Sequence, residues 1–387
     1  MKNSRIAAAS IAAAAAFGLA ACGSASNDSS GNSASSNSSS SSAAGASAGS
    51  SASSGSSAGG SATCFSGSLK SSGSTAQQNA INQAIAAYTQ QCKGAKTSYT
   101  GSGSGQGITD FIGKQTDWAG SDSALDPAKG EPDKAKASCG SQAIDLPMVV
   151  GPIAVIYNLK GVGKLILTPQ LTAKIFSGKI TEWNNAEIAK ANPGVKLPSQ
   201  KISVFFRSEA SGTSDNFSNF LNQTDKTDWP DQHSKQWTGK VGQGKKGSAG
   251  VGQAVSSTPG AIGYDEWSYA ITNKLNMAEM DSGSGPVALT AESAGQAIAA
   301  AKVVGTGKDV SLAINYNTKA KGAYPIVLAT YEIACLKYSN PTTAKNVKAF
   351  LTYLASDGFQ GTLTQVGSAP LPKSIQQKVQ ESIAAIS

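Results

Sequence analysis

Short apolar runs alternate with amphipathic stretches along most of the chain after about residue 63, a pattern typical of α/β proteins. The run Ile202–Phe206 predicts a buried strand, and apolar residues spaced by three and four in Asn216–Leu221 predict a helix after it. A second helical pattern begins at Ile108 and continues through Phe111 and Ile112. In a third, Ala80, Ile81, Ala84, Ile85 and Tyr88 fall on one helical face.

The segment between the predicted strand and the helix at Asn216–Leu221 is rich in small and hydroxyl residues. Backbone N–H groups and hydroxyls at the positive N-terminus of a helix form a favourable anion site. Arg207 is close enough in sequence to fold over the same place, and its planar guanidinium suits a phosphate or a carboxylate. The candidate anion ligands of this turn are Arg207, Ser211, Gly212 and Thr213.

Two related turns precede the other predicted helices. In Leu69–Ala76, Thr75 is expected to cap the helix and to face whatever lies above the turn. In Tyr99–Gly107, glycines on both sides of Ser104 let the backbone approach a ligand closely. One such turn alone is more often a plain helix cap, and neither matches a dinucleotide or Walker A motif. Three of them, each after a plausible strand, favour a shared anion site.

Asp122 is expected at the carboxyl end of a short strand, where ligands bind in open α/β sheets. A carboxylate beside an anion is favourable if the anion carries a proton that the carboxylate can accept. Phosphate carries such a proton at neutral pH and sulfate does not, so Asp122 would select phosphate. The alternative is that Asp122 only caps the turn that follows at Ser123–Leu125.

The N-terminus has a basic start, an apolar run from Ile6 to Ala21 and small residues before Cys22. This is the pattern of a secretory signal peptide over residues 1–21, and Leu19–Cys22 resembles a lipoprotein cleavage site that leaves Cys22 lipidated. Ordinary cleavage with an incidental Cys22 is the alternative. Residues 22–62 are nearly all Ser, Gly, Ala and Asn and predict a flexible tether with a reach of roughly 35 Å.

The length and charge of the remaining chain narrow its class. Residues 63–387 exceed one ordinary core and indicate two domains. The net charge of +8 falls to +6 once Lys2 and Arg5 leave with the signal peptide. The lysines are scattered, and no basic patch interleaved with aromatic residues is present. The positive net charge therefore favours a small anion as the ligand over nucleic acid. With His233 as the one histidine and no CxxC motif, the sequence indicates no metal site.

Four cysteines remain after Cys22, and an even number in an exported chain predicts two disulfides. Three pairings are possible, and free buried cysteines are the alternative. Cys64 precedes the first predicted strand, and Cys92 ends the first predicted helix, which runs back beside that strand. The favoured pairing is therefore Cys64–Cys92, which leaves Cys139–Cys335.

These turns, together with other motifs in the same order, resemble the phosphate-binding receptor of the high-affinity phosphate ABC transporter. The resemblance covers nearly the whole chain after the tether. Its further motifs are Gly178–Ile188, Asn192–Ser199, Pro259–Tyr264 and Tyr324–Ile326.

The resemblance implies a type II periplasmic-binding-protein fold with two lobes joined by a two-strand hinge and a ligand cleft between them. Lobe 1 would comprise 63–152 and 323–387, and lobe 2 would comprise 153–322. The chain would be an extracytoplasmic receptor, monomeric and anchored by its lipid to the outer face of the cell membrane. It would deliver inorganic phosphate to the permease subunits of an ABC transporter, without a cofactor and without enzymatic activity.

The implied phosphate ligands come from both lobes. Lobe 2 supplies the four residues of the turn after Ile202–Phe206, and Glu209 orients Arg207. Two positions depart from the family pattern: a frequent Thr-Phe is Thr75-Ala76 here, and a frequent Asp is Glu209. From lobe 1 the ligands would be Thr75, the backbone amide of Ala76, Ser104 and Asp122.

Three other functions fit part of the pattern. A secreted phosphatase or phosphoryl transferase would use the anion turns, but no Ser/His/Asp, Cys/His or two-metal arrangement accompanies them. A surface adhesin on a Ser-rich stalk would reuse the binding fold. A transport receptor for sulfate, molybdate or a phosphonate would keep the architecture, and Asp122 argues against the first two of these ligands.

Overall fold

The computed structural model describes residues 63–387. These residues lie within one compact unit of the chain. The predicted signal peptide, the lipidation site at Cys22 and the predicted tether over 22–62 lie outside the described residues. None of the helices formed by residues 63–387 is long and apolar enough to cross a membrane.

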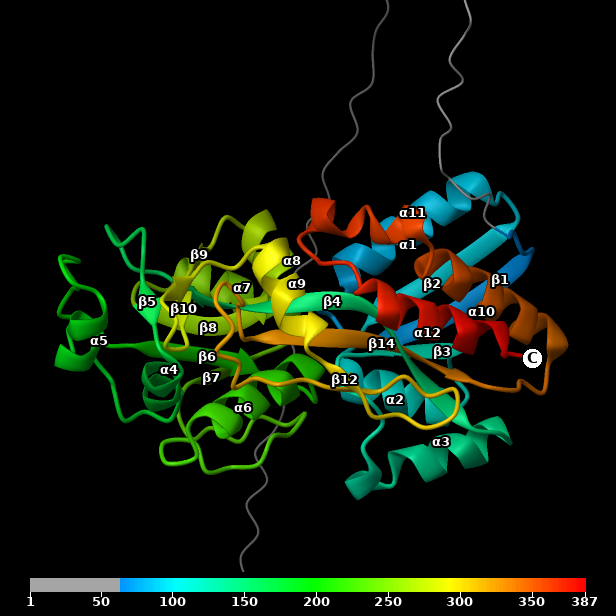
Figure 1. Ribbon diagram of the computed structural model, residues 1–387, viewed down its shortest axis with the longest axis horizontal. Helices are drawn as coiled ribbons and strands as arrows, with labels where there is room; N and C mark the ends of the chain where they lie inside the picture. The colour runs from blue at the N-terminus through cyan, green and yellow to red at the C-terminus, as the bar shows by residue number, and fades with distance from the viewer. Residues whose placement is uncertain (1–62) are drawn as a thin grey trace, which may run out of the picture. The chain divides into compact units, whose positions relative to one another are not determined.

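The main sheet has nine strands and two halves (Figure 1). In the first half, three parallel strands lie in the order β2 (Ala95–Gly101), β1 (Gly67–Gly73) and β3 (Trp118–Ser121). The antiparallel strand β14 (Val327–Cys335) follows and pairs with β4 (Ala143–Tyr157). The predicted α/β class is confirmed.

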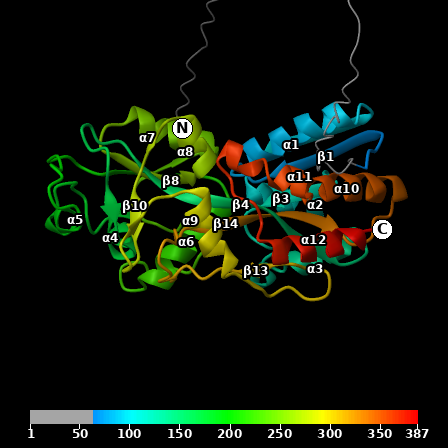
Figure 2. The same ribbon diagram turned by 45° about the horizontal axis from the view of Figure 1, so that its top comes forward.

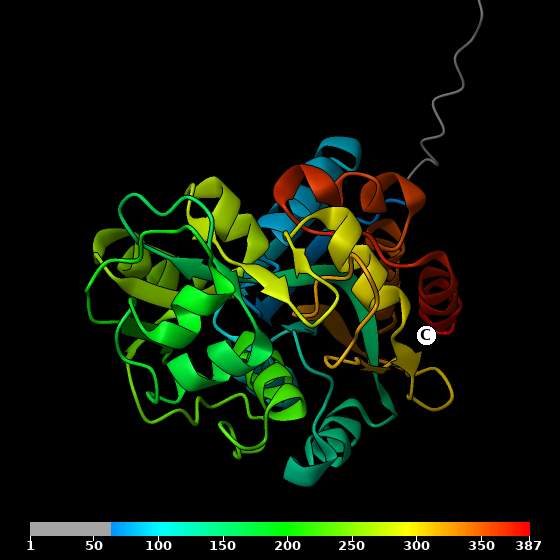
Figure 3. The same ribbon diagram turned by 60° about the vertical axis from the view of Figure 1, so that its left-hand side comes forward.

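The second half of the sheet continues from β4 through β8 (Ala261–Glu266) to β6 (Ser203–Arg207) and the edge strand β7 (Gln243–Lys245). β6 is parallel to both of its neighbours. The short strand β9 (Asn276–Met277) pairs with residues 156–157 of β4, on the opposite edge from β8. Figure 3 shows the green and yellow-green elements of the second half apart from the blue and red elements of the first.

Strand β4 runs through both halves of the sheet, because its N-terminal and C-terminal parts pair with different strands. Residues 143–152 pair with β14, whereas residues 153–157 pair with β8, and every side chain of the strand is buried. The segment that leads from the second half back into β14, around residues 324–326, lies beside β4. The Ile153 N–H donates to the Ile326 carbonyl at 2.9 Å, and the Tyr324 hydroxyl donates to the Ile153 carbonyl at 3.0 Å. Two chain segments therefore join the halves side by side, as Figure 2 shows for β4 and β14.

Helices cover both faces of each half. On one face of the first half, apolar side chains of α1 (Gln78–Gln91), α10 (Pro341–Leu354) and α12 (Lys373–Ala384) form one core cluster. On the other face, α2 (Ser104–Ile112) and α3 (Glu131–Cys139) contribute to a smaller cluster. A third cluster fills the second half and contains residues from α4 (Pro169–Phe176), α6 (Gly212–Thr224), α7 (Gly247–Ser257) and α8 (Trp267–Thr272).

Helix α9 (Ala291–Ala299) lies within the range predicted for lobe 2, yet its buried apolar residues belong to the core cluster of the first half. The lobe boundaries at 152/153 and 322/323 therefore remain a prediction. The remaining elements are β5 (Ile166–Leu167), β10 (Glu279–Asp281), β11 (Pro286–Val287), β12 (Lys302–Val303), β13 (Leu312–Ala313), α5 (Ala186–Ala191), α11 (Asp357–Gln360) and the 3₁₀ turns η1 (Pro127–Lys129) and η2 (Leu363–Val366).

Two disulfides tie the first half together, with the favoured pairing. Cys64–Cys92 joins the segment before β1 to the end of α1, with 5.2 Å between Cα atoms. Cys139–Cys335 joins the end of α3 to the end of β14, with 5.5 Å between Cα atoms. Cross-links between distant parts of a chain stabilise a fold chiefly by restricting its unfolded state.

Candidate anion-binding site

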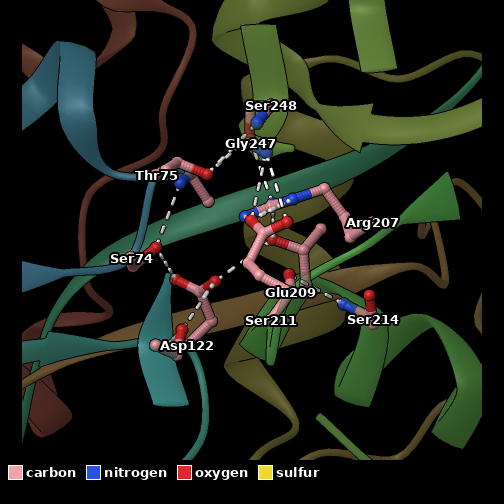
Figure 4. Close-up of polar contacts among 12 residues, drawn as sticks. Ser74, Thr75, Asp122, Arg207, Glu209, Ser211, Ser214, Gly247 and Ser248 are labelled. Atoms are coloured by element: carbon pink, nitrogen blue, oxygen red, sulfur yellow. Dashed lines mark hydrogen bonds and ion pairs between the residues drawn. The ribbon is translucent and has the colours of Figure 1, made fainter. Parts of the chain in front are cut away.

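The three predicted turns and Asp122 meet where the two halves of the sheet face each other. Figure 4 shows Asp122 with residues of the turns after β1 and β6. Asp122 follows β3, and the turns follow β1, β2 and β6. The side chains at this junction are almost completely withdrawn from solvent, with Asp122 and Arg207 each 2% exposed. Because charges are rarely buried without partners, their contacts indicate what the junction is built to hold.

The two oxygens of Asp122 have different partners. Oδ1 accepts hydrogen bonds from the hydroxyls of Ser74 and, at 2.9 Å, Thr330. Oδ2 accepts hydrogen bonds from the hydroxyls of Thr213 at 3.1 Å and Ser104 at 3.4 Å, which are two of the predicted ligands. The side chain does not cap the turn that follows, so that alternative is wrong.

The ionisation of Asp122 reflects this environment. Burial raises the pKa of Asp122, while the hydroxyls of Ser74, Thr330 and Thr213 and the charge of Arg207 lower it. The hydroxyl donors and the arginine are the groups that favour the carboxylate form. A charged Asp122 is an acceptor only, since an ionised carboxylate has no hydrogen to donate.

Glu209 holds the guanidinium of Arg207 in one orientation. Its Oε1 accepts from Arg207 Nε at 2.8 Å and from Nη2, and it also accepts from the Gly247 N–H at 3.1 Å. The remaining nitrogen, Nη1, points to Thr213 at 3.3 Å and Ser248 at 3.4 Å. The longer Glu in place of Asp therefore still pairs with Arg207, and one side of the guanidinium faces the predicted ligands.

The N-terminus of α6 approaches Asp122 too closely for any side chain at its first residue. A Cβ on Gly212 would lie 2.7 Å from both Asp122 Cβ and Ser104 Oγ. Ser211 caps the helix, because its Oγ accepts from the Ser214 N–H at 3.3 Å. The first-turn N–H groups of α6 therefore lie next to the carboxylate and hydroxyls of the first half.

The second turn needs its glycine. Gly103 has a φ of 96°, a left-handed conformation that glycine adopts at little cost, and a Cβ there would lie 2.9 Å from Glu209 Cγ. Ser104 then begins α2 and donates through its hydroxyl toward Asp122, while the Gly105 N–H donates to the Ala210 carbonyl at 2.9 Å. The turn thus contacts the other half through its backbone.

The prediction that Thr75 caps the first helix is wrong. Helix α1 begins at Gln78, its N-cap position is Gln77, and no side chain caps it. The Thr75 hydroxyl instead contacts Ser248 of the second half, with 3.2 Å between the two side-chain oxygens. Ala76 follows, and its N–H donates to Ser74 Oγ at 3.0 Å.

Contacts between the halves continue at the edge of the junction. The Ser123 hydroxyl donates to Asp215 at 2.6 Å, and Asp215 also pairs with His233 at 2.7 Å. Lys235 Nζ lies 3.2 Å from Glu131 Oε2. The contacts of Ser123 with Asp215 and of Lys235 with Glu131 therefore also join the two halves.

Three residues of this site were missed by sequence reasoning: Ser74, Ser248 and Thr330. Ser74 lies inside a turn that the sequence singled out, and Ser248 follows a glycine at a helix start, so each had a signal. Thr330 lies inside a fully buried strand and had none. Within residues 63–387 no group of three or more His, Cys, Asp or Glu side chains could hold a metal ion.

Comparisons with known proteins agree with one another. The sequence model described as "PBP superfamily domain" matches residues 32–358. The phosphate-binding protein PstS2 of Mycobacterium bovis is 47% identical over 317 residues, which cover 81% of this chain and 85% of the relative. The phosphate-binding protein PstS of Xylella fastidiosa is 32% identical over 306 residues, 78% of this chain and 80% of the relative.

Solved structures show the same fold at lower identity. A high-affinity periplasmic phosphate-binding protein with bound phosphate has a TM-score of 0.65 and 23% identity, covering 81% of this chain and 93% of that one. A phosphate-binding protein from Stenotrophomonas maltophilia has a TM-score of 0.65 and 20% identity, covering 82% of this chain and 94% of that one. At these identities the likeness is one of fold alone.

Proposed function

The chain belongs to the PstS phosphate-binding proteins of the PBP superfamily, and we propose that it binds inorganic phosphate between two lobes and delivers it to an ABC permease for import. Its fold is the two-lobed periplasmic-binding-protein fold. The family consists of substrate-binding transport proteins and not of enzymes, so the polar residues of the junction are assigned binding roles.

The observation that carries the proposal is that the two oxygens of Asp122 have different donors, and that the predicted ligands Thr213 and Ser104 are the donors to Oδ2. Ser74 and Thr330 donate to Oδ1, whereas Oδ2 accepts from the predicted ligands Ser104 and Thr213 and is therefore the oxygen on the side of the proposed ligand. A bound anion held by those hydroxyls would place an oxygen near Oδ2. A carboxylate accepts only, so that oxygen must carry a hydrogen.

This requirement separates phosphate from sulfate. Both forms of phosphate that dominate near neutral pH carry at least one proton, whereas sulfate carries none. Sulfate would meet Asp122 Oδ2 with a bare oxygen, a buried repulsive contact without a hydrogen bond, which penalises it strongly.

The remaining phosphate oxygens need donors, and the junction supplies them from both lobes. Arg207 offers Nη1, held in place through its pairing with Glu209. Ser211 and Thr213 offer hydroxyls, and Gly212 and Thr213 offer first-turn N–H groups of α6, where the helix dipole favours an anion. Thr75, Ser104 and the amide of Ala76 would complete the set from the first lobe.

Closure of the lobes would be the signal that the permease reads, as in other hinged binding proteins. Contacts that exist only when the lobes meet support this role. They include Asp122 with Thr213 and Thr75 with Ser248. Phosphate would strengthen closure because its ligands come from both sides.

The proposal includes the location of the receptor. We propose that Cys22 carries a lipid that anchors the protein to the outer face of the cell membrane, with residues 22–62 as a tether and the protein as a monomer. The signal-peptide pattern over 1–21 and the Ser- and Gly-rich composition that follows support this arrangement. Mass spectrometry of the membrane-extracted protein should find a diacylated N-terminal Cys22, and an unmodified soluble form would contradict it.

Calorimetric titration of the purified protein with phosphate, sulfate and molybdate tests the binding function. We expect one phosphate to bind tightly and neither of the other anions to compete. Uptake of radiolabelled phosphate by cells that depend on this receptor should fall when the chain is deleted. Tight binding of molybdate or sulfate without phosphate would replace the proposal with a receptor for another anion.

A further inference from the structure

Two strand–turn–helix units of the same kind lie side by side in the second half of the sheet. Strands β6 and β7 are parallel neighbours, with Arg207 opposite Lys245 in register. The helix that follows each strand begins with a glycine, and its second residue carries a hydroxyl: Thr213 in α6 and Ser248 in α7. Thr213 belongs to the proposed phosphate site, whereas Ser248 has no assigned role.

Ser248 occupies the same kind of place as Thr213. Arg207 Nη1 lies 3.3 Å from the Thr213 hydroxyl oxygen and 3.4 Å from that of Ser248. Thr213 also donates to Asp122 across the junction at 3.1 Å. Ser248 contacts Thr75 of the other half, with 3.2 Å between the two hydroxyl oxygens, as Figure 4 shows. Each hydroxyl therefore contacts Arg207 and one predicted ligand of the other half.

The surroundings of Ser248 suit an anion. The side chain is completely buried, and its backbone N–H donates to Thr75 Oγ1 at 3.2 Å. Ser248 stands in the first turn of α7, an 11-residue helix whose positive end faces Arg207 and Thr75. Its oxygen can accept from Arg207 while its hydrogen is donated to a third group, because a hydroxyl does both.

We propose that Ser248 is a further phosphate ligand, which donates its hydroxyl hydrogen to a phosphate oxygen held between Arg207 and Thr75. The inference rests on the proposed phosphate-binding function and adds one residue to its site. The oxygens of phosphate that do not face Asp122 need only donors, and Ser248 supplies one beside the guanidinium.

The Ser248 hydroxyl has a competing role as a hydrogen-bond donor to the carboxyl of Asp265. The carboxyl of Asp265 is buried, and burial raises its pKa to about 8, while the charge of Arg207 and the hydroxyl of Ser248 lower it. If Ser248 served only Asp265, its removal would change the stability of the ligand-free protein and leave the affinity for phosphate intact. The two roles are therefore separable by experiment.

The test compares Ser248→Ala and Ser248→Cys with the wild-type protein. Cysteine keeps the shape of serine, fills the site with a somewhat larger sulfur and donates only weakly, so it separates hydrogen bonding from the loss of packing. The matched control is Ser256→Ala in the same helix, an exposed residue whose hydroxyl bonds to the Gln253 carbonyl at 2.9 Å. The phosphate dissociation constant is measured by calorimetry, and the ligand-free thermal midpoint is measured alongside it.

We expect both Ser248 variants to raise the phosphate dissociation constant roughly ten- to a hundredfold, the effect of losing one hydrogen bond to a charged partner. The Ser256→Ala control should bind like wild type. The inference is overturned if both variants keep wild-type affinity, or if only Ser248→Ala weakens binding, because that pattern reports packing. A wild-type protein that does not bind phosphate would instead overturn the proposed function itself.

Discussion

The replacement Asp122→Asn probes the selection of a protonated anion. Hydroxyls of Ser74 and Thr330 donate to Oδ1, so they should keep the oxygen of an asparagine on that side. The amide nitrogen would then take the place of Oδ2 and face Ser104 and Thr213. A position that only accepts a hydrogen bond thereby becomes one that only donates.

The size of the effect follows from this exchange. Phosphate loses a hydrogen bond to a charged acceptor, which contributes about 1.5–3 kcal/mol, so its affinity should fall roughly ten- to a hundredfold. Sulfate loses a buried repulsion and gains a donor. Its affinity should rise, and the preference for phosphate should shrink by on the order of a hundredfold or more.

Calorimetric titration of both proteins with phosphate and sulfate at neutral pH measures these changes. The control is Asp133→Asn on α3, where an exposed aspartate loses the same charge away from the site. If Asp122→Asn leaves both affinities unchanged, the carboxylate does not accept a proton from the ligand and the reasoning fails.

The pH dependence gives an independent check of the same residue. Burial raises the pKa of Asp122 above its usual value of 3.8, although its hydroxyl partners and Arg207 oppose the shift. Phosphate binding needs the carboxylate, so wild-type affinity is present above this pKa and falls as the pH decreases through it. The Asp122→Asn protein should show no such loss in that range, and parallel profiles for the two proteins would contradict the assignment.

Three further predictions concern the arginine, a disulfide and the edge of the junction. Arg207→Ala should weaken phosphate binding by about 2–5 kcal/mol in calorimetry, because a buried charged contact loses one partner; a loss under about 1 kcal/mol would make the arginine peripheral. Replacing Cys139 and Cys335 together by alanine should lower the free energy of unfolding, measured in urea, by about 2–4 kcal/mol, because the disulfide restricts the unfolded chain. The phosphate affinity should stay the same, and an unchanged unfolding midpoint would contradict the prediction. Hydrogen bonding to Asp215 raises the pKa of His233, so the protonated pair stabilises the fold below pH 6.5 and this contribution disappears as the pH rises through the folded-state pKa. The thermal midpoint of His233→Gln should therefore fall below that of wild type at pH 5.5 and match it near pH 9, and an equal difference at both pH values would exclude the pair as its cause.

Local sequence signals predicted the elements that carry the site. The apolar run Ile202–Phe206 differs by one residue at each end from β6, because burial on a sheet dictates such runs directly. Asp122 immediately follows a strand, as its position in the sequence indicated. The backbone at Gly103 and Gly212 lies so close to residues of the other half that a Cβ would not fit. Such a position requires glycine, and the requirement is therefore visible in the sequence.

Contacts between distant segments could not be read in the same way. Thr75 has the residue type of a helix cap, but its hydroxyl contacts Ser248, and α1 begins three residues later. Thr330 reaches Asp122 only because β14 lies beside β3 in the sheet, a pairing that joins segments far apart in the chain. Tertiary contacts of this kind override local preference, and one sequence carries no direct record of them.

The most direct test of the central claim is a side-by-side titration of the wild-type protein with phosphate and sulfate, each at a neutral and a mildly alkaline pH. Phosphate remains protonated at both pH values, and sulfate is bare at both. If the site requires a proton on the anion oxygen opposite Asp122, phosphate should bind tightly at both pH values and sulfate should show no measurable binding at either. Comparable affinities for the two anions would contradict the account, because a site without a proton requirement would have no reason to reject sulfate.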